Sequence, residues 1–178
     1  HSSLGARQFA DGPFYLYCHL KTIIFGTQND SSSLNQNFMD TRTLISGLLG
    51  GIVYWLLGAL FYAFLLADLF ESLSGSATGV SRAPEEMVWW ALVLGNLLMG
   101  LGLAYIMNNW AKISTLVAGV KAGALIGLLL ALGYDLVWYA TTNLIQLPGV
   151  FLDVATFAVM SAGSGAVIGW WLGRSARA

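Results

Sequence analysis

The chain contains few of the residue types that carry out most protein chemistry. Of its 178 residues, one is cysteine, two are histidine and three are proline, and only 10% are charged. Cys18, His1 and His19 all lie before Met39, so neither type occurs from Met39 onward. Over that stretch, the absence excludes thiolate nucleophiles, cysteine or histidine haem ligands, the usual zinc sites and an imidazole proton relay. We therefore expect no cofactor and no bound metal.

The charge balance and the hydrophobic content place most of the chain in lipid. A net charge of −1 leaves no basic face for nucleic acid, so nucleic acid is not an expected partner. Hydrophobic residues make up 57% of the sequence, and charged residues fall well below the roughly one quarter that is typical of soluble domains. A soluble protein of this size could not bury so much apolar surface. We expect the lipid bilayer to be its main partner.

Residues 1–38 differ in composition from the rest of the chain. They are polar in patches, and a run rich in serine, asparagine and glutamine closes the segment. The apolar stretch from Phe14 to Phe25 is shorter than the roughly 20 residues of a membrane span, and it lacks the features of a signal peptide. Because Met39 is a natural start, we expect residues 1–38 to be a leader, derived from a vector or from upstream translation. A native cytoplasmic extension with an interfacial segment is the alternative.

Four apolar segments follow within residues 39–178, and each has the roughly 20 residues that a membrane span requires. Because lipid offers no partners to backbone amides, all four should be α-helices. The connections are short except for residues 67–87, which read as an exposed turn region in which Pro84, Glu85 and Glu86 start the second helix. The sequence thus predicts an all-α fold, a polytopic four-transmembrane-helix bundle with short loops. Its helices are expected at about 44–66, 88–110, 116–140 and 150–172.

The distribution of basic residues predicts the orientation in the membrane. Arg82, in the connection after the first helix, is the one basic residue expected on the outer side of the membrane. The opposite side carries Arg42, Lys112, Lys121, Arg174 and Arg177. Because basic residues favour the cytoplasmic side, we expect a multi-pass protein with both termini in the cytoplasm, and an even number of spans agrees with this.

Small residues recur at every fourth position of the third and fourth segments. They are Gly119, Gly123, Gly127 and Ala131 in one row, and the GxxxG pair Gly165 and Gly169. Glycine weakens helices in water by roughly 1 kcal/mol relative to alanine, but it allows close helix approach in membranes. The rows predict packing inside the bundle, and the alternative is a seam between copies of the chain along the glycines of the first row. Asn96, in the second segment, is expected to hydrogen-bond between helices.

Several blocks of the sequence carry a likeness to known proteins. They are GGIVYWLLGALFYAFLLADLFE, ATGVSRAPEEMVWWALVLGNLLMGLGLAYI, KAGALIGLLLALGYDLVWYATTNL and GAVIGWWLG. Together they resemble a family of small, uncharacterised bacterial four-helix membrane proteins of the Bacteroidetes type. The resemblance covers about Met39 to Gly173. It implies four transmembrane helices in the bacterial inner (cytoplasmic) membrane, and it brings no catalytic residues to carry over.

Acidic side chains gather on the side opposite most of the basic ones. They are Asp68, Glu71, Glu85, Glu86, Asp135 and Asp153. Asp135 continues the small-residue row of the third segment, and ionisable groups in spans are costly and usually face the bundle or water. The candidate ion or ligand site is therefore Asp135, Trp138, Tyr139, Thr142 and Asp153. The alternative is that the acids occupy solvated interfaces and helix caps.

Three functions are consistent with these residues. The first is a non-enzymatic integral membrane protein, structural or accessory, that packs with itself or within a larger membrane complex through glycine-rich seams. The second is a small cation or solute transporter or channel with Asp135 as its intramembrane ionisable site. The third is an enzyme acting on lipid through Asp135 or Asp153, for which the sequence offers no paired acid or base. We expect the first.

Overall fold

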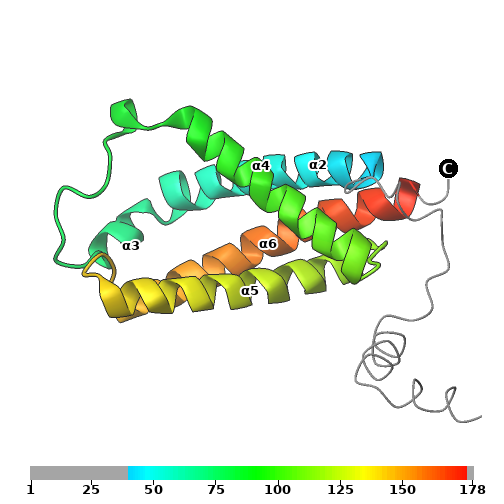
Figure 1. The fold of residues 1–178 in the computed structure, drawn as a ribbon. Coiled ribbons are helices and arrows are strands. Elements are labelled where there is room, and N and C mark those ends of the chain that lie inside the picture. Colours follow the sequence, from blue (N-terminus) through cyan, green and yellow to red (C-terminus); the bar gives the residue numbers. More distant parts are fainter. Residues whose placement is uncertain (1–39, 176–178) are drawn as a thin grey trace, which may run out of the picture. The chain divides into compact units, whose positions relative to one another are not determined.

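A computed structural model describes residues 40–175 as helices joined by short connections, with one longer connection between the first two spans (Figure 1). Four helical stretches are long and apolar enough to cross a membrane. They are α2 (Thr41–Gly58) continued by η2 (Ala59–Leu65), α4 (Trp89–Tyr105) continued by η4 (Ile106–Trp110), α5 (Leu116–Thr141) and α6 (Leu147–Ser175). The predicted all-α fold with four membrane-spanning helices is therefore confirmed. The leader predicted over residues 1–38 lies outside the described residues.

The connection between the first two spans contains more helix than its composition predicts. The short helix α3 (Ala67–Ser72) follows η2 directly, and η3 (Pro84–Glu86) is a separate 3-10 turn. The prediction that Pro84 and the two glutamates start the second span is wrong, because α4 begins at Trp89. Val88 separates the two elements, since its ψ of 78° lies outside the helical range.

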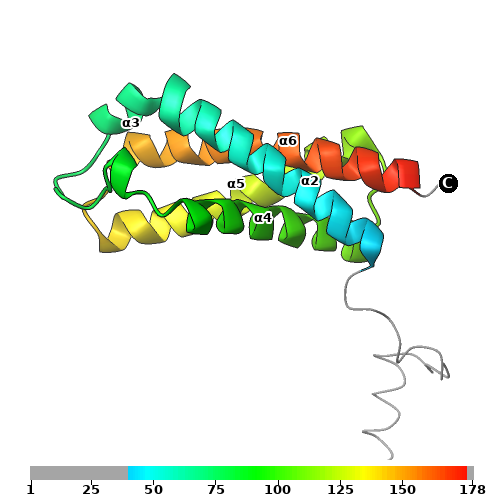
Figure 2. The same cartoon turned by 90° about the horizontal axis from the view of Figure 1, so that it is seen from above.

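The two ends of the bundle differ in charge. The start of α2, the start of α5 and the end of α6 lie together at one end (Figure 2). We call this the basic end, because Arg42, Lys112 and Arg174 lie there. The opposite end, formed by α3, η3 and the connection between α5 and α6, carries Asp68 and Glu71, and we call it the acidic end.

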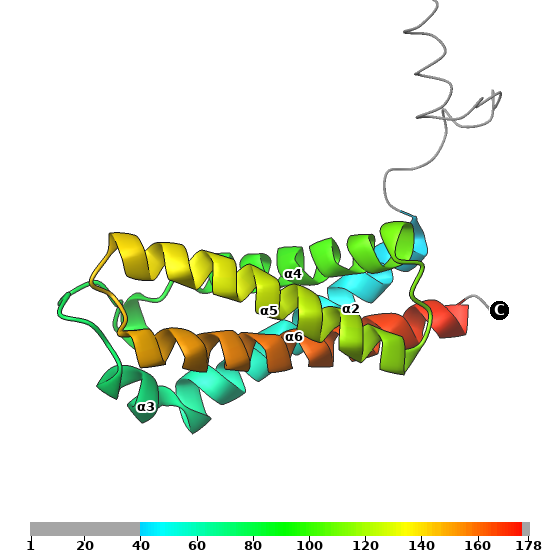
Figure 3. The same ribbon diagram turned by 90° about the horizontal axis from the view of Figure 1, so that it is seen from below.

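The helices pack in the order α4, α2, α6, α5. The contact of α5 with α6 is the most extensive, α2 packs against both α4 and α6, and α4 and α5 share no comparable contact within residues 40–175. Figure 3 shows α5 and α6 side by side along their length, and Figure 2 shows α2 crossing α6. In consequence α4 and α5 are outer helices, each packed along one neighbour.

Glycines bring the neighbouring backbones into direct contact. A Cβ atom on Gly100 of α4 would collide with the backbone of Gly47 and Gly51 on α2. A Cβ atom on Gly119 or Gly123 of α5 would collide with carbonyl oxygens of α6. The buried residues of α5 are Gly119, Gly123, Gly127 and Ala131. Because α6 of the same chain already covers this row, the row is not a free surface on which a second copy could form a seam.

Buried polar groups tie the helices together. The hydroxyl of Tyr54 on α2 donates to Oγ of Ser161 on α6 at 2.8 Å. The amide of Asn108 in η4 donates to the hydroxyl oxygen of Thr43 on α2 at 2.7 Å. The side chain of Asn96 instead donates at 2.8 Å to a carbonyl oxygen of its own helix, four residues back. The prediction that Asn96 hydrogen-bonds between helices is therefore wrong. The carbonyl oxygen four residues back lies within easy reach of its short polar side chain.

Candidate functional site

The four-residue rows of α5 and α6 face each other in register. The two helices run antiparallel, and a Cβ atom on Gly119 would lie 3.2 Å from Cα of Gly169. One turn further along α5 and one turn back along α6, a Cβ atom on Gly123 would lie 3.2 Å from Cα of Gly165. Residues four apart share a helix face. Three further steps of four residues, forward along α5 from Gly123 and back along α6 from Gly165, lead to a pair of carboxylates.

These carboxylates are Asp135 on α5 and Asp153 on α6. Their carboxyl groups are close enough to interact electrostatically. Oδ2 of Asp135 is buried and has no hydrogen-bond partner within residues 40–175. The hydroxyl of Tyr62, near the end of the first span, donates a hydrogen bond of 2.6 Å to Oδ1 of Asp153. The cluster therefore joins side chains from three spans near the acidic end.

Tyr62 is placed by an irregularity of the first span. It lies in η2, where the amide of Leu66 donates to the carbonyl oxygen of Phe61, five residues back, at 2.8 Å. Such π-helical turns are frequent at functional sites. The ring of Phe70 on α3 packs against that of Tyr62, with the ring centroids 5.0 Å apart. Sequence reasoning missed Tyr62, because a tyrosine near a helix end is also what a membrane interface favours.

The other three residues of the predicted site make contacts of their own. The ring of Trp138 packs against Tyr134, with the centroids 5.8 Å apart. The hydroxyl of Thr142 donates to the carbonyl oxygen of Trp138 at 2.8 Å, and Tyr139 is 42% exposed. None of these contacts includes Asp135. The structure thus brings together the two aspartates of the predicted set, and adds Tyr62 to them.

The remaining acids lie on the surface of the protein. Asp68, Glu71, Glu85 and Glu86 are all exposed. Within residues 40–175, no group of three or more His, Cys, Asp or Glu side chains is arranged to hold a metal ion. The carboxyl pair with the phenol of Tyr62 offers fewer ligands than the six to eight oxygens that Ca²⁺ takes.

The chemistry of the pair follows from its position. Two carboxyl groups in contact repel each other strongly when both are ionised, and a surrounding of low dielectric strengthens that repulsion. A proton held between the two groups, or a single bound cation, removes the repulsion. Ionisable side chains inside membrane spans are typical of ion and proton pathways. The arrangement is suited to holding and passing on one positive charge.

No protein family, curated protein or solved structure matches the chain. Its four apolar helices fit a small integral, multi-pass membrane protein.

Proposed function

We propose that this small membrane protein is a non-enzymatic structural or accessory subunit, which assembles with further copies of itself or with a larger membrane complex. The observation that carries the proposal is the open surroundings of two glycines on the outer helix α4. A Cβ atom on Gly95 or Gly102 would meet no atom within 4 Å.

Glycines in such positions favour a covering helix. Gly95 and Gly102 are seven residues apart, which is close to two helical turns, so they lie on one face of α4. A helix that faces only lipid gains from larger residues, because glycine lowers helix propensity and offers fewer dispersion contacts. Close approach of another helix restores those contacts. The exposed glycines of α4 are therefore the place where we expect assembly.

The proposal includes the location of the protein. We place it in the bacterial inner membrane with both termini in the cytoplasm, because the basic end carries Arg42, Lys112 and Arg174 and the positive-inside rule orients such an end inward. The resemblance of Met39 to Gly173 to small bacterial membrane proteins agrees with this location.

Mass measurement of the full chain in mild detergent tests the assembly. We expect a species larger than one chain, or a copurifying membrane protein. Gly95→Leu and Gly102→Leu should each shift the protein to the smaller species, because the new side chain blocks close approach. Leu94→Phe enlarges an exposed side chain one position away on α4 and is the control that should leave the mass unchanged. A strictly monomeric protein without a copurifying partner would overturn the proposal.

A second candidate function is supported by the buried, unpartnered Oδ2 of Asp135 beside Asp153. In this case the chain is a small proton or cation transporter or channel, and Asp135 is its ionisable site. Four spans are few for a pore, so this function also requires assembly. Proton or cation flux into liposomes should fall in Asp135→Asn and remain in Asp68→Asn, whose carboxylate is exposed at the acidic end. Absence of flux in the unmodified protein, or equal flux in both variants, removes this candidate.

A further inference from the structure

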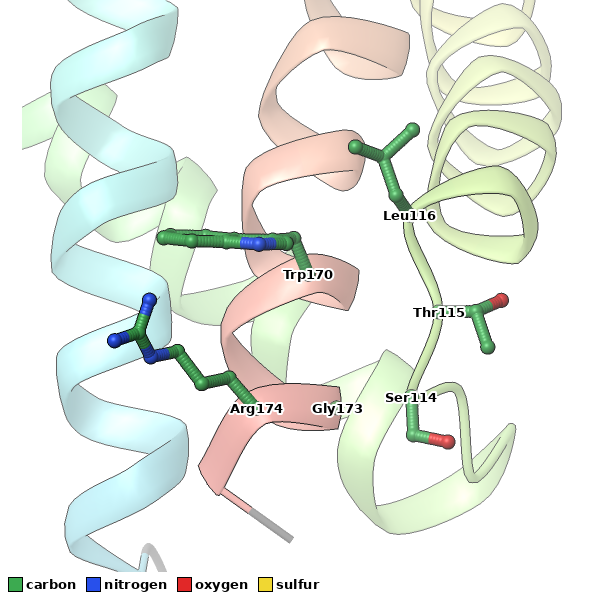
Figure 4. Close-up of a pocket in the computed structure, with 6 residues that line it drawn as sticks. All are labelled: Ser114, Thr115, Leu116, Trp170, Gly173 and Arg174. Carbon is green, nitrogen blue, oxygen red and sulfur yellow. The ribbon is translucent and has the colours of Figure 1, made fainter. Parts of the chain in front are cut away.

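A hollow of about 400 Å³ lies at the basic end, where the end of α6 meets the start of α5. Figure 4 shows Trp170 and Arg174 extending from α6 on one side, Leu116 on the other, and Gly173 between them. The hydroxyl of Ser114 points away from Arg174 in this view. The hydroxyl of Thr115, which also lines the space, points away from Arg174 as well and accepts a hydrogen bond from the amide of Ala118. The charged group of the space is the guanidinium of Arg174, and we call the space the Arg174 hollow.

The guanidinium of Arg174 is available to a ligand. It lies over the ring of Trp170, 5.7 Å from the ring centroid, and makes no hydrogen bond or ion pair with the residues that the structure describes. The carbonyl oxygen of Leu172, in the last turn of α6, receives its hydrogen bond from Arg42 at 3.0 Å. Arg174 is therefore not needed to cap the carbonyl oxygen of Leu172.

An apolar slot of about 170 Å³ adjoins the hollow. The slot shares Leu116 and Trp170 with the hollow, and Ala166 and Val167 complete it. Ala166 precedes Arg174 by eight residues, just over two helical turns, so it lies about 12 Å closer to the middle of the span. The slot thus extends from the charged end of α6 toward the membrane interior, as an acyl chain extends from its headgroup.

The charges around the hollow favour an anion. Among residues 40–175, Asp40 is the single acid at the basic end, and its carboxylate caps the start of α2. The basic side chains at this end are Arg42, Lys112 and Arg174. Basic residues at a membrane surface attract anionic lipids. The start of α5 on one rim adds partial positive charge, and the end of α6 on the other adds partial negative charge, so the basic side chains decide the sign.

We propose that the Arg174 hollow and its slot bind one anionic phospholipid of the surrounding bilayer, with the phosphate at Arg174 and part of an acyl chain in the slot. Leu116 is 50% exposed and Trp170 is 45% exposed, so both walls reach the outer surface of the bundle. A free phosphate would use the hollow alone, whereas the slot adds contacts that require an acyl chain. The proposal does not depend on assembly or on transport.

Native mass spectrometry of the full, delipidated chain in detergent tests the proposal. The protein is titrated with phosphatidylglycerol, with phosphatidylcholine of the same acyl chains, and with inorganic phosphate. We expect one phosphatidylglycerol to bind more tightly than phosphatidylcholine, and phosphate alone to bind weakly. Arg174→Gln should weaken phosphatidylglycerol binding by about fivefold, the effect of one basic residue near an anionic lipid surface.

Two matched controls make the result specific. Lys121 is two residues from both Gly119 and Gly123, which face α6, so it projects from the opposite side of α5. Lys121→Gln removes the same charge and should leave binding unchanged. Ala166→Phe fills the slot and should weaken binding, whereas Ala155→Phe at an exposed position of α6 should not.

Four outcomes would overturn the proposal. They are equal binding of the two lipids, equal losses in Arg174→Gln and Lys121→Gln, undiminished binding when the slot is filled, and binding of inorganic phosphate as tight as that of phosphatidylglycerol. The last would show a site for a free anion. Thermal unfolding of each variant, measured in the same detergent, identifies any variant that loses binding because it unfolds. If Ala166→Phe unfolds, Val167→Phe replaces it, and binding that survives a filled slot counts against the proposal.

Discussion

The close contact between α5 and α6 allows us to predict how much Gly123→Ala lowers the free energy of unfolding. The new Cβ atom would collide with the carbonyl oxygen of Ser161 and would lie 3.2 Å from Cα of Gly165. Both are backbone atoms, so no side chain can turn aside to make room. Because carbon atoms pack best at about 3.5–4.0 Å, α5 and α6 must separate at this point, by an amount on the order of 1 Å.

The cost of that separation can be estimated by comparison with a glycine on the same helix. Overpacking a close contact costs about 1–3 kcal/mol, and a gap of 0.5–1 Å forfeits roughly a quarter to a half of each dispersion contact it opens. Lipid is as apolar as the helix surfaces, so no hydrophobic term offsets this loss. Gly133→Ala adds the same methyl group to α5 where nothing lies within 4 Å. Both variants gain the same helix propensity, so their difference isolates the packing cost.

We expect Gly123→Ala to be less stable than Gly133→Ala by about 1–3 kcal/mol. The free energy of unfolding is measured by titrating the protein from mild detergent into sodium dodecyl sulfate and following tryptophan fluorescence. Gly133→Ala should equal or slightly exceed the unmodified protein, because alanine favours helix. Equal stability of the two variants would refute the close packing of α5 on α6 and the register argued from it.

Three further predictions concern polar contacts and orientation. Asn108→Leu removes the 2.7 Å hydrogen bond to the buried hydroxyl of Thr43, and it should lower the free energy of unfolding by roughly 0.6–2 kcal/mol in the same titration; no loss would show that the bond contributes nothing. Tyr62→Phe removes the 2.6 Å bond to Asp153 and should cost about 0.5–1.5 kcal/mol, a loss that should disappear when Asp153→Ala, which has no side-chain acceptor, is already present. In a Cys18→Ser background, Ser81→Cys and Lys112→Cys should react with a membrane-impermeant thiol reagent from opposite sides of the membrane, and labelling of both from one side would contradict the four-span topology.

Composition and periodicity were sufficient to predict the four spans, because lipid permits almost no other backbone structure. Their ends depend on single residues that these signals do not resolve. The first span begins at Thr41, since Asp40 caps its first amides, and the last begins at Leu147, since Pro148 is compatible with a first helical turn. The second begins later than the Pro84 signal indicates, because Val88 interrupts the helical backbone.

The candidate site was only partly visible in the sequence. Asp135 could be found because it continues the glycine row of α5, and the same spacing in α6 leads from Gly165 back to Asp153. The contribution of Tyr62 could not be found, because it depends on the π-helical turn of η2, which has no signature in composition or periodicity. The ring of Trp138 packs against Tyr134 on the same helix, and its place in a ligand site stays a prediction.

The carboxyl pair and the glycine row depend on one register. A repeat of four small residues does not by itself choose that register, because sliding α6 by one turn keeps most small residues opposite one another. Ser161 does choose it, since its side chain lies against Gly127 and accepts the hydrogen bond of Tyr54 from a third helix. A slide of one turn would break that bond and move the two carboxyl groups apart by about 5 Å. Substitutions in the glycine row therefore disturb packing and site together. Asp135→Asn, which leaves the row intact and nearly preserves the shape of the side chain, is the change that separates a role in passing charge from a role in holding the helices together.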